Sequence, residues 1–240
     1  MRRDDPNLPY LRLVAEALGD LRDQVVFVGG AVAGLLVTDP MADSVRATRD
    51  VDAVIEAARA QFHRIEARIA TRGFTRDMDS EVICRWIHRD SGVLFDLMPV
   101  DAGVLGFSNR WYPYTVETAE PVELADGVSI RVASAMAFVA TKLEAFADRG
   151  AGDILASHDL EDVLNIVDGR EELAQELAAA SPAVRQAVAE ALAALLAHPD
   201  FANALPGLIA EPERAGIVAE RLQAMAVWAT HTATNAPSGP

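Results

Sequence analysis

Three aspartates of this chain lie in apolar segments, where the presence of a carboxylate needs a chemical explanation. Asp50 and Asp52 are two residues apart, and residues two apart in a strand project from the same face. Asp96 interrupts the apolar run 93–98, where an ionised carboxylate is costly unless a positive group compensates it. Mg²⁺ prefers such hard oxygen ligands, usually together with substrate phosphates. The three residues therefore predict a site for divalent cations.

Simpler explanations of these residues stay open at this point. Asp-x-Asp is common in solvated turns, and Asp96 could simply pair with an arginine such as Arg85. Gly29 and Gly30 favour the cation site, because they end an expected strand and precede an expected helix at Ala31. Glycines there let backbone N–H groups approach a phosphate, although Gly-Gly alone also marks an ordinary tight turn.

Taken in order, these residues resemble the nucleotidyltransferase superfamily that shares the polymerase-beta palm. Its pattern is a hydrophobic residue with Gly-Gly or Gly-Ser, then Asp-x-Asp, then a third acidic residue on a strand. The closer similarity is to the AbiEii/AbiGii-type nucleotidyltransferase group, several members of which are toxins of toxin-antitoxin pairs. It rests on Gly29-Gly30-Ala31, Thr48-Arg49-Asp50-Val51-Asp52, Thr141-Lys142-Leu143-Glu144-Ala145 and His158-Asp159-Leu160-Glu161-Asp162. The stretch from 31 to 49 is longer than the superfamily commonly shows, which predicts an inserted loop.

The resemblance implies a nucleotidyltransferase, of the EC 2.7.7 class, that moves an NMP from an NTP to an acceptor hydroxyl. It implies two Mg²⁺ ions held by Asp50, Asp52 and Asp96, with Asp96 also accepting the proton. The implied nucleotide-binding residues are Gly29, Gly30, Arg46, Thr48, Arg49 and Lys142.

Lys142, Asp159 and Asp162 complete the candidate catalytic residues. Lys142 falls on the apolar stripe of an expected helix, where it needs an anionic partner or carries its ammonium out to water. Asp159 and Asp162 share one helix face, near a helix start where carboxylates also serve as caps. The resemblance implies that Lys142 contacts phosphate and that one aspartate orients it or acts as general base.

Composition excludes several classes of protein. The 240 residues are 51% hydrophobic, which is enough to bury a core. A formal charge of -15 argues against indiscriminate DNA binding and against anionic membranes. The single Cys84 excludes an intramolecular disulfide, and no leader or membrane-spanning run is evident. We expect a cytoplasmic protein.

The expected fold class is α+β. Residues 1–133 are predicted to form a nucleotidyltransferase module with a mixed sheet flanked by helices, residues 134–229 a helical bundle, and residues 230–240 a disordered tail. The expected helices of the first module cover 8–21, 31–37 and 56–72, its strands cover 24–28, 50–55, 81–88, 92–100, 115–124 and 128–132, and a surface loop covers 101–113.

The acceptor is left open by the sequence. An RNA end, a protein or a small molecule would each serve, and an antitoxin protein is a further expected partner. Arg64, Arg68 and Arg72 recur on one helix and would either guide RNA or form a solvated face. Two alternatives of other kinds are an antibiotic-type adenylyltransferase and a catalytically silent nucleotide-binding or interaction module.

Overall fold

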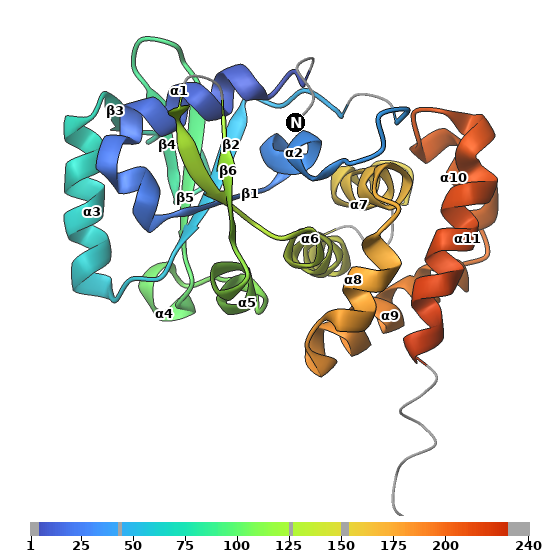
Figure 1. The fold of residues 1–240 in the computed structure, drawn as a ribbon. Coiled ribbons are helices and arrows are strands. Elements are labelled where there is room, and N and C mark those ends of the chain that lie inside the picture. Colours follow the sequence, from blue (N-terminus) through green and yellow to red (C-terminus); the bar gives the residue numbers. More distant parts are fainter. Residues whose placement is uncertain (1–4, 43–44, 125–126, 150–153, 230–240) are drawn as a thin grey trace, which may run out of the picture. The chain divides into compact units, whose positions relative to one another are not determined.

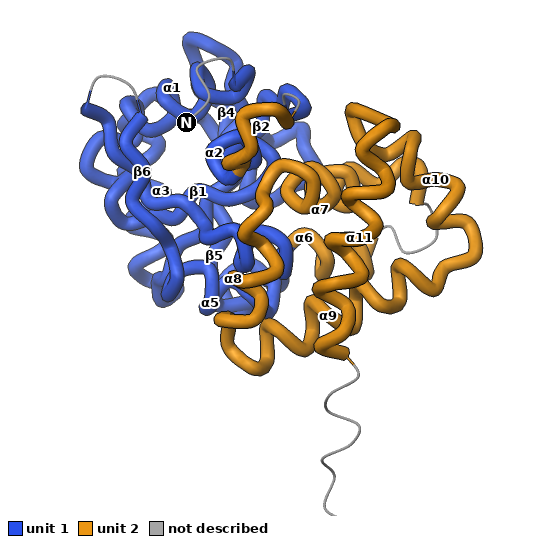
Figure 2. The backbone as a smooth tube through the Cα atoms, turned by 45° about the vertical axis from the view of Figure 1, so that its right-hand side comes forward, with its two compact units in different colours: residues 1–36, 44–141 blue, residues 37–43, 142–240 orange. Residues whose placement is uncertain are grey.

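The computed structural model describes residues 5–42, 45–124, 127–149 and 154–229. It contains a seven-stranded mixed sheet together with helices (Figure 1). The chain divides into two compact units (Figure 2): the sheet unit comprises residues 1–36 and 44–141, and the helical unit comprises residues 37–43 and 142–240. The α+β class expected from the sequence is confirmed.

The sheet has the strand order β3-β4-β5-β2-β1-β7-β6. The strands are β1 Val26–Val28, β2 Asp50–Ile55, β3 Phe74–Arg76, β4 Arg85–His88, β5 Leu94–Pro99, β6 Glu120–Glu123 and β7 Ser129–Val132. β2 has the bounds expected from the sequence and lies in the middle of the sheet, parallel to β5 and antiparallel to β1. The strands expected at 81–88 and 92–100 correspond to β4 and β5, and those expected at 115–124 and 128–132 correspond to β6 and β7; each pair is antiparallel.

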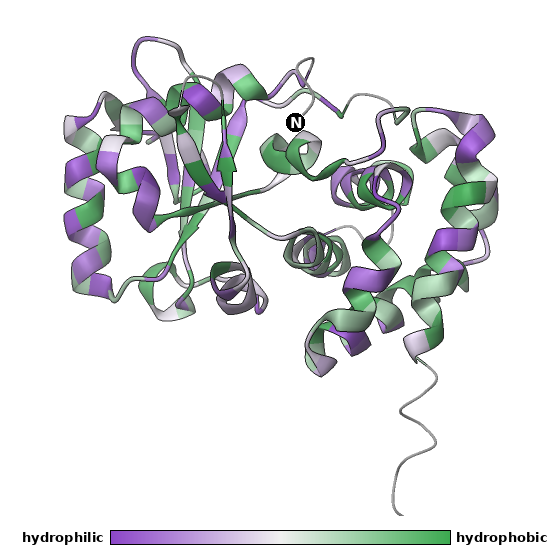
Figure 3. Cartoon of the chain, in the orientation of Figure 1, coloured by the Kyte–Doolittle hydropathy of each residue, from purple (hydrophilic) through white to green (hydrophobic). Residues whose placement is uncertain are grey.

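Helices and short 3-10 turns accompany the sheet. They are α1 Leu8–Leu18, η1 Gly19–Gln24, η2 Gly30–Val32, α2 Ala33–Leu36, α3 Arg59–Thr71, α4 Ala102–Leu105 and α5 Tyr112–Glu117. α3 is banded green and purple in Figure 3, because its buried residues Phe62, Ile65 and Ile69 alternate with polar ones at helical spacing. Phe27 and Phe95 on the central strands are fully buried and belong to the core of this unit.

Several expected elements of the sheet unit were wrong. The expected loop 101–113 contains α4, which Asp101 caps by accepting a 2.7 Å hydrogen bond from the Gly103 N–H. Pro113 lies in the first turn of α5, where its missing N–H costs nothing, and α5 also takes residues 115–117 from the expected strand. β3 was not expected, since a three-residue strand with one buried side chain gives no periodic signal. The helix expected from 56 begins at Arg59, and the strand expected from 81 begins at Arg85.

The helical unit receives the end of α6 and all later helices. They are α6 Ala135–Arg149, α7 His158–Gly169, α8 Leu173–Ala179, α9 Pro182–Leu196, α10 Phe201–Leu208, η4 Pro212–Arg214, α11 Ala215–Ala226 and η5 Val227–Ala229. The segment 37–43 belongs here because the N–H groups of Thr38 and Asp39 both donate to the Gly169 carbonyl at 2.9 Å. Arg214 adds ion pairs to Asp39 at 3.0 Å and to Asp168 at 2.7 Å.

The change from sheet to helices lies between Val132 and Ala135, whereas the compact units divide after Thr141. The tail 230–240, expected to be disordered, lies outside the described residues. Across the described part of the chain, no helix combines the length and apolarity needed to cross a membrane.

Candidate active site

Strand register brings the three predicted aspartates onto one face of the sheet. Asp52 on β2 is paired with Asp96 on β5, and Asp96 is paired with Arg85 on β4. Residues paired across neighbouring strands point to the same face, and Asp50 shares that face with Asp52. We call Asp50, Asp52 and Asp96 the carboxylate row; Arg85 stands at its end.

Arg85 holds Asp96 with two hydrogen bonds. Its Nε donates to Oδ1 at 2.9 Å and its Nη2 donates to Oδ2 at 2.8 Å, the bidentate geometry typical of strong Arg–carboxylate pairs. Nη2 also reaches Oδ2 of Asp50 at 3.4 Å. The Asp96 side chain is 8% exposed, whereas that of Asp50 is 44% exposed. The hydrogen bond to Asp96 raises the pKa of Arg85 above its ordinary value, so the guanidinium stays charged.

The row therefore offers cation ligands unevenly. Asp50 and Asp52 present two carboxylates on one face of β2. One or two carboxylates, together with substrate phosphates, commonly bind Mg²⁺ in proteins. Asp96 has both oxygens engaged by Arg85. In the described residues, no three His, Cys, Asp or Glu side chains are grouped so as to hold a metal ion. The residues fit one cation at Asp50 and Asp52; the predicted two-ion site with Asp96 stays a prediction.

Gly29 leaves the space that Asp52 occupies. Val28 is paired with Asp52 across β1 and β2, and Gly29 follows with a φ of 71°. A Cβ at Gly29 would lie 1.9 Å from Oδ2 of Asp52. Only glycine both adopts this positive φ readily and lacks the Cβ that would clash with Asp52. The expected turn from strand to helix is present, because Gly30 opens η2 directly after β1.

Asn7 and Thr48 position Asp50, and sequence reasoning missed the role of Asn7. Asn7 is fully buried; its Nδ2 donates to the Arg46 carbonyl at 3.0 Å, and its Oδ1 accepts from the Thr48 N–H at 2.8 Å. The Thr48 hydroxyl donates in turn to Oδ1 of Asp50 at 2.9 Å. The expected nucleotide-binding residues Thr48 and Arg46 thus belong to the segment before β2 that the Asn7 side chain holds, while Arg49 is exposed. Before a helix, Asn7 resembles an ordinary N-cap, but its side chain makes no capping bond.

Lys142, Asp159 and Asp162 meet in the helical unit. The Lys142 Nζ lies 3.0 Å from Oδ1 of Asp159 and 2.7 Å from Oδ2 of Asp162. Arg149 approaches Oδ2 of Asp159 at 2.8 Å. The cap of α7 is the Ser157 hydroxyl, which accepts from the Leu160 N–H at 3.3 Å, so Asp159 turns its side chain to the cations instead.

Lys142 is charged in this setting. Burial alone would lower its pKa, but the charges of Asp162 and Asp159 outweigh burial and raise the pKa above its ordinary value. Its side chain is 14% exposed and that of Asp162 is 3% exposed, so the ammonium does not extend into water. It is also the only lysine of the chain, since the other 20 basic residues are arginines.

Comparison with known proteins decides the family. A sequence model described as "Nucleotidyl transferase AbiEii toxin, Type IV TA system" matches residues 12–227. The chain belongs to the AbiEii family. The resemblance drawn from the four motifs is therefore confirmed. A comparison with curated protein sequences found no match.

The fold of this AbiEii-family chain is also similar to that of a solved nucleotidyltransferase-like protein. An antigenic nucleotidyltransferase-like protein from Paracoccidioides brasiliensis is 18% identical, with a TM-score of 0.54 over 92% of this chain and 94% of that chain. JHP933 from Helicobacter pylori is 11% identical, with a TM-score of 0.49 over 95% of each chain. At this identity, the first similarity supports the fold.

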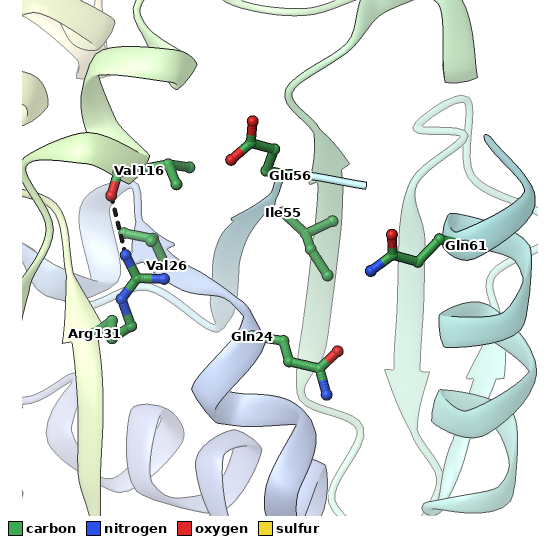
Figure 4. Close-up of a pocket in the computed structure, with 7 residues that line it drawn as sticks. All are labelled: Gln24, Val26, Ile55, Glu56, Gln61, Val116 and Arg131. Atoms are coloured by element: carbon green, nitrogen blue, oxygen red, sulfur yellow. Dashed lines mark hydrogen bonds between the residues drawn. The ribbon is translucent and has the colours of Figure 1, made fainter. Parts of the chain in front are cut away.

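A small pocket of the AbiEii-family chain lies away from the carboxylate row. It has a volume of about 260 Å³ and is lined by Gln24, Ile55 and Arg131 among others (Figure 4). Arg131 is fixed there by donating to the Val116 carbonyl at 3.0 Å. Ile55 ends β2 and Asp50 begins it, so the two sites are separated by about 16 Å of strand. No predicted site residue lines the pocket.

Proposed function

We propose that this AbiEii-family chain is a nucleotidyltransferase that moves an NMP from an NTP to an acceptor hydroxyl with the help of a divalent cation. The observation that carries the proposal is the pair Asp50 and Asp52 on one face of β2, with Gly29 beside Asp52. Mg²⁺ is the cation that these ligands suit best. We further propose that the protein is the toxin of a toxin-antitoxin pair, acts in the cytoplasm and has an antitoxin partner.

The reaction joins the acceptor oxygen to the α-phosphorus of the NTP. The bond between the α-phosphorus and the bridging oxygen breaks, pyrophosphate leaves with the electron pair, and the acceptor proton passes to solvent or a nearby base. A bound Mg²⁺ would supply positive charge to the phosphates. Asp50 and Asp52 would hold the cation, and Thr48 would keep Asp50 in place through the 2.9 Å hydrogen bond.

Lys142 is the second proposed contact to the nucleotide. Asp159 and Asp162 hold its charged ammonium in a fixed position. A lysine ammonium is a compact positive charge, which suits contact with a phosphate. Asp159 and Asp162 are then positioning residues for Lys142. The backbone at Gly29 and Gly30, and the side chains of Arg46 and Arg49, remain proposed nucleotide contacts.

A transfer assay tests the proposal. The purified protein is incubated with Mg²⁺ and each of four α-labelled NTPs, with total RNA or with a panel of hydroxylated small molecules. The matched control is the Asp50→Ala/Asp52→Ala variant. We expect label to enter an acceptor with the wild type alone. Label in RNA identifies an RNA-directed enzyme, and label on a small molecule favours the antibiotic-type enzyme.

If no acceptor is labelled and Mg²⁺ does not promote NTP binding, the chain is a silent module. Growth of a bacterial host that expresses the chain gives an independent test of the toxin function. We expect the wild type to arrest growth and the Asp50→Ala/Asp52→Ala variant to allow normal growth. Growth arrest by both proteins would mean that toxicity does not depend on nucleotidyl transfer.

A further inference from the structure

We propose that Asp96 serves as the anchor of Arg85, and that the Arg85 guanidinium takes the place of a second cation beside Asp50 and Asp52. This inference rests on the proposed function, because it concerns the same site. It assigns a role to Arg85, and it gives Asp96 a role other than that of a cation ligand.

The geometry of β4 and β5 commits Asp96 to Arg85. Arg85 and Asp96 are paired across β4 and β5, so the backbone of two hydrogen-bonded strands directs both side chains to one face. The two hydrogen bonds of 2.9 and 2.8 Å occupy both oxygens of Asp96. A cation bound by Asp96 would have to displace a bidentate partner from a side chain that is 8% exposed.

Charge balance in the carboxylate row requires three positive charges. Asp50, Asp52 and Asp96 carry three negative charges in one patch of the sheet. One guanidinium and one divalent cation balance these charges, and Arg85 already reaches Asp50 at 3.4 Å as well as Asp96. A second divalent cation would add two positive charges next to the guanidinium, and like charges at such distances repel strongly. The row is therefore complete with one cation.

Arg85 is also held in place by its surroundings. Its side chain is 18% exposed, and the residue before it, Cys84, is buried with its carbonyl accepting from the Leu97 N–H at 3.1 Å. Arg85 is thus a pre-organised positive charge, which costs little reorganisation when the charge of a phosphate develops nearby.

Counting cations tests the inference. Mn²⁺ replaces Mg²⁺, and bound Mn²⁺ is measured by electron paramagnetic resonance at saturating concentration of an NTP analogue with a methylene group between the α- and β-phosphorus. We expect one Mn²⁺ per protein in the wild type and one in Asp96→Asn. Two in the wild type, or the loss of one in Asp96→Asn, would overturn the inference. The absence of any Mn²⁺-dependent binding would instead remove the proposed function.

A double-mutant cycle tests the partnership of the two residues. If they act as a unit, Arg85→Gln and Asp96→Asn each lower kcat by about 100-fold with little change in KM for the NTP, and the double variant is no worse than either single one. Arg85→Lys, which keeps the charge but not the bidentate contact, should recover part of kcat. Full activity of Arg85→Gln, or additive losses in the double variant, would contradict the partnership.

Folding is controlled within the same set of variants. Arg85→Gln leaves Asp96 buried without its counter-charge, and we expect its Tm to fall, whereas Arg85→Gln/Asp96→Asn should recover most of the loss. Arg89→Gln is the matched control, since Arg89 lies on the same hairpin and donates to the carbonyls of Ala70 and Phe74 rather than to a carboxylate. Its kcat should stay within a few-fold of wild type.

Discussion

Lys142 shows how much a single side chain depends on its surroundings in this protein. Its ammonium lies between Asp159 and Asp162, and Asp162 is nearly inaccessible to water. A buried carboxylate is tolerated only with its counter-charge. Lys142, which we propose to contact the nucleotide, therefore also stabilises the helical unit.

Lys142→Met should lower the free energy of unfolding by about 3–5 kcal/mol, because it leaves Asp162 buried and uncompensated. Arg149→Ala is the control; its side chain is 71% exposed, so its loss should cost under about 1 kcal/mol. Urea unfolding measures both. The raised pKa of Lys142 keeps its stabilising contribution complete at neutral pH, and that contribution disappears only as the pH rises through the raised value. Equal losses in both variants would contradict the prediction.

Cys84 should resist thiol reagents in the folded protein. Burial, and then the charges of Asp96 and Asp52, raise the pKa of this thiol to about 12, so almost no thiolate is present at pH 8. We expect one slowly reacting thiol in native buffer and rapid reaction in denaturant, followed by the absorbance of a released aromatic thiol. Rapid labelling of the native protein would show that the strand end at Cys84 opens.

Individual residues also show where sequence reasoning stops. The two-residue period of a strand predicted that Asp50 and Asp52 share a face. The apolar surroundings of Asp96 predicted that this carboxylate has a positively charged partner. Sequence could not choose between Mg²⁺ and Arg85, because the choice depends on the pairing register of β4 and β5. Asn7 could not be predicted at all, since its partners are the backbone groups of Arg46 and Thr48, about 40 residues away.

At the scale of elements, long segments were predicted better than short ones. β2 and α1 have strong patterns over many residues, and both were found close to their expected bounds of 50–55 and 8–21. β3 and α4 have three and four residues, and their positions depend on neighbours rather than on a periodic pattern. The segment 37–43 was likewise unpredictable as part of the helical unit, because its partner Gly169 lies far along the chain.

The turn after β1 gives a test at the element scale. Gly29→Ala should lower kcat by at least about 100-fold, because the new Cβ would displace the carboxylate of Asp52. Gly92→Ala is the control: its φ of 70° is also positive, so alanine there is strained, but a Cβ there meets nothing within 4 Å. Gly92→Ala should lose stability and keep kcat. Similar kcat values for both variants would mean that Asp52 needs no such space.

At the scale of the whole molecule, charge is divided unequally between the two units. The sheet unit has 15 basic and 19 acidic residues, and the helical unit has 6 basic and 17 acidic residues. An anionic acceptor would therefore meet less repulsion on the sheet unit. The expected basic face of α3 is partly neutralised, since Arg68 and Arg72 both pair with Asp20. This pairing favours the solvated-face alternative over an RNA guide.

Asp20→Asn should therefore strengthen binding of single-stranded RNA, because it releases Arg68 on α3 and Arg72 at the end of that helix for phosphate contacts. With a net charge of -15, we expect the wild type to bind a random RNA oligonucleotide with a Kd weaker than about 100 µM at physiological salt. The variant should bind roughly threefold more tightly at low salt, and the gain should vanish at high salt as phosphate contacts are screened.

Asp23→Asn is the control, since it changes the net charge equally but its side chain is 74% exposed and lies 3.9 Å from Arg22. Fluorescence anisotropy measures all three proteins. Equal gains in the two variants would assign the effect to net charge, and a tight wild-type complex would restore α3 as a guide for an RNA acceptor.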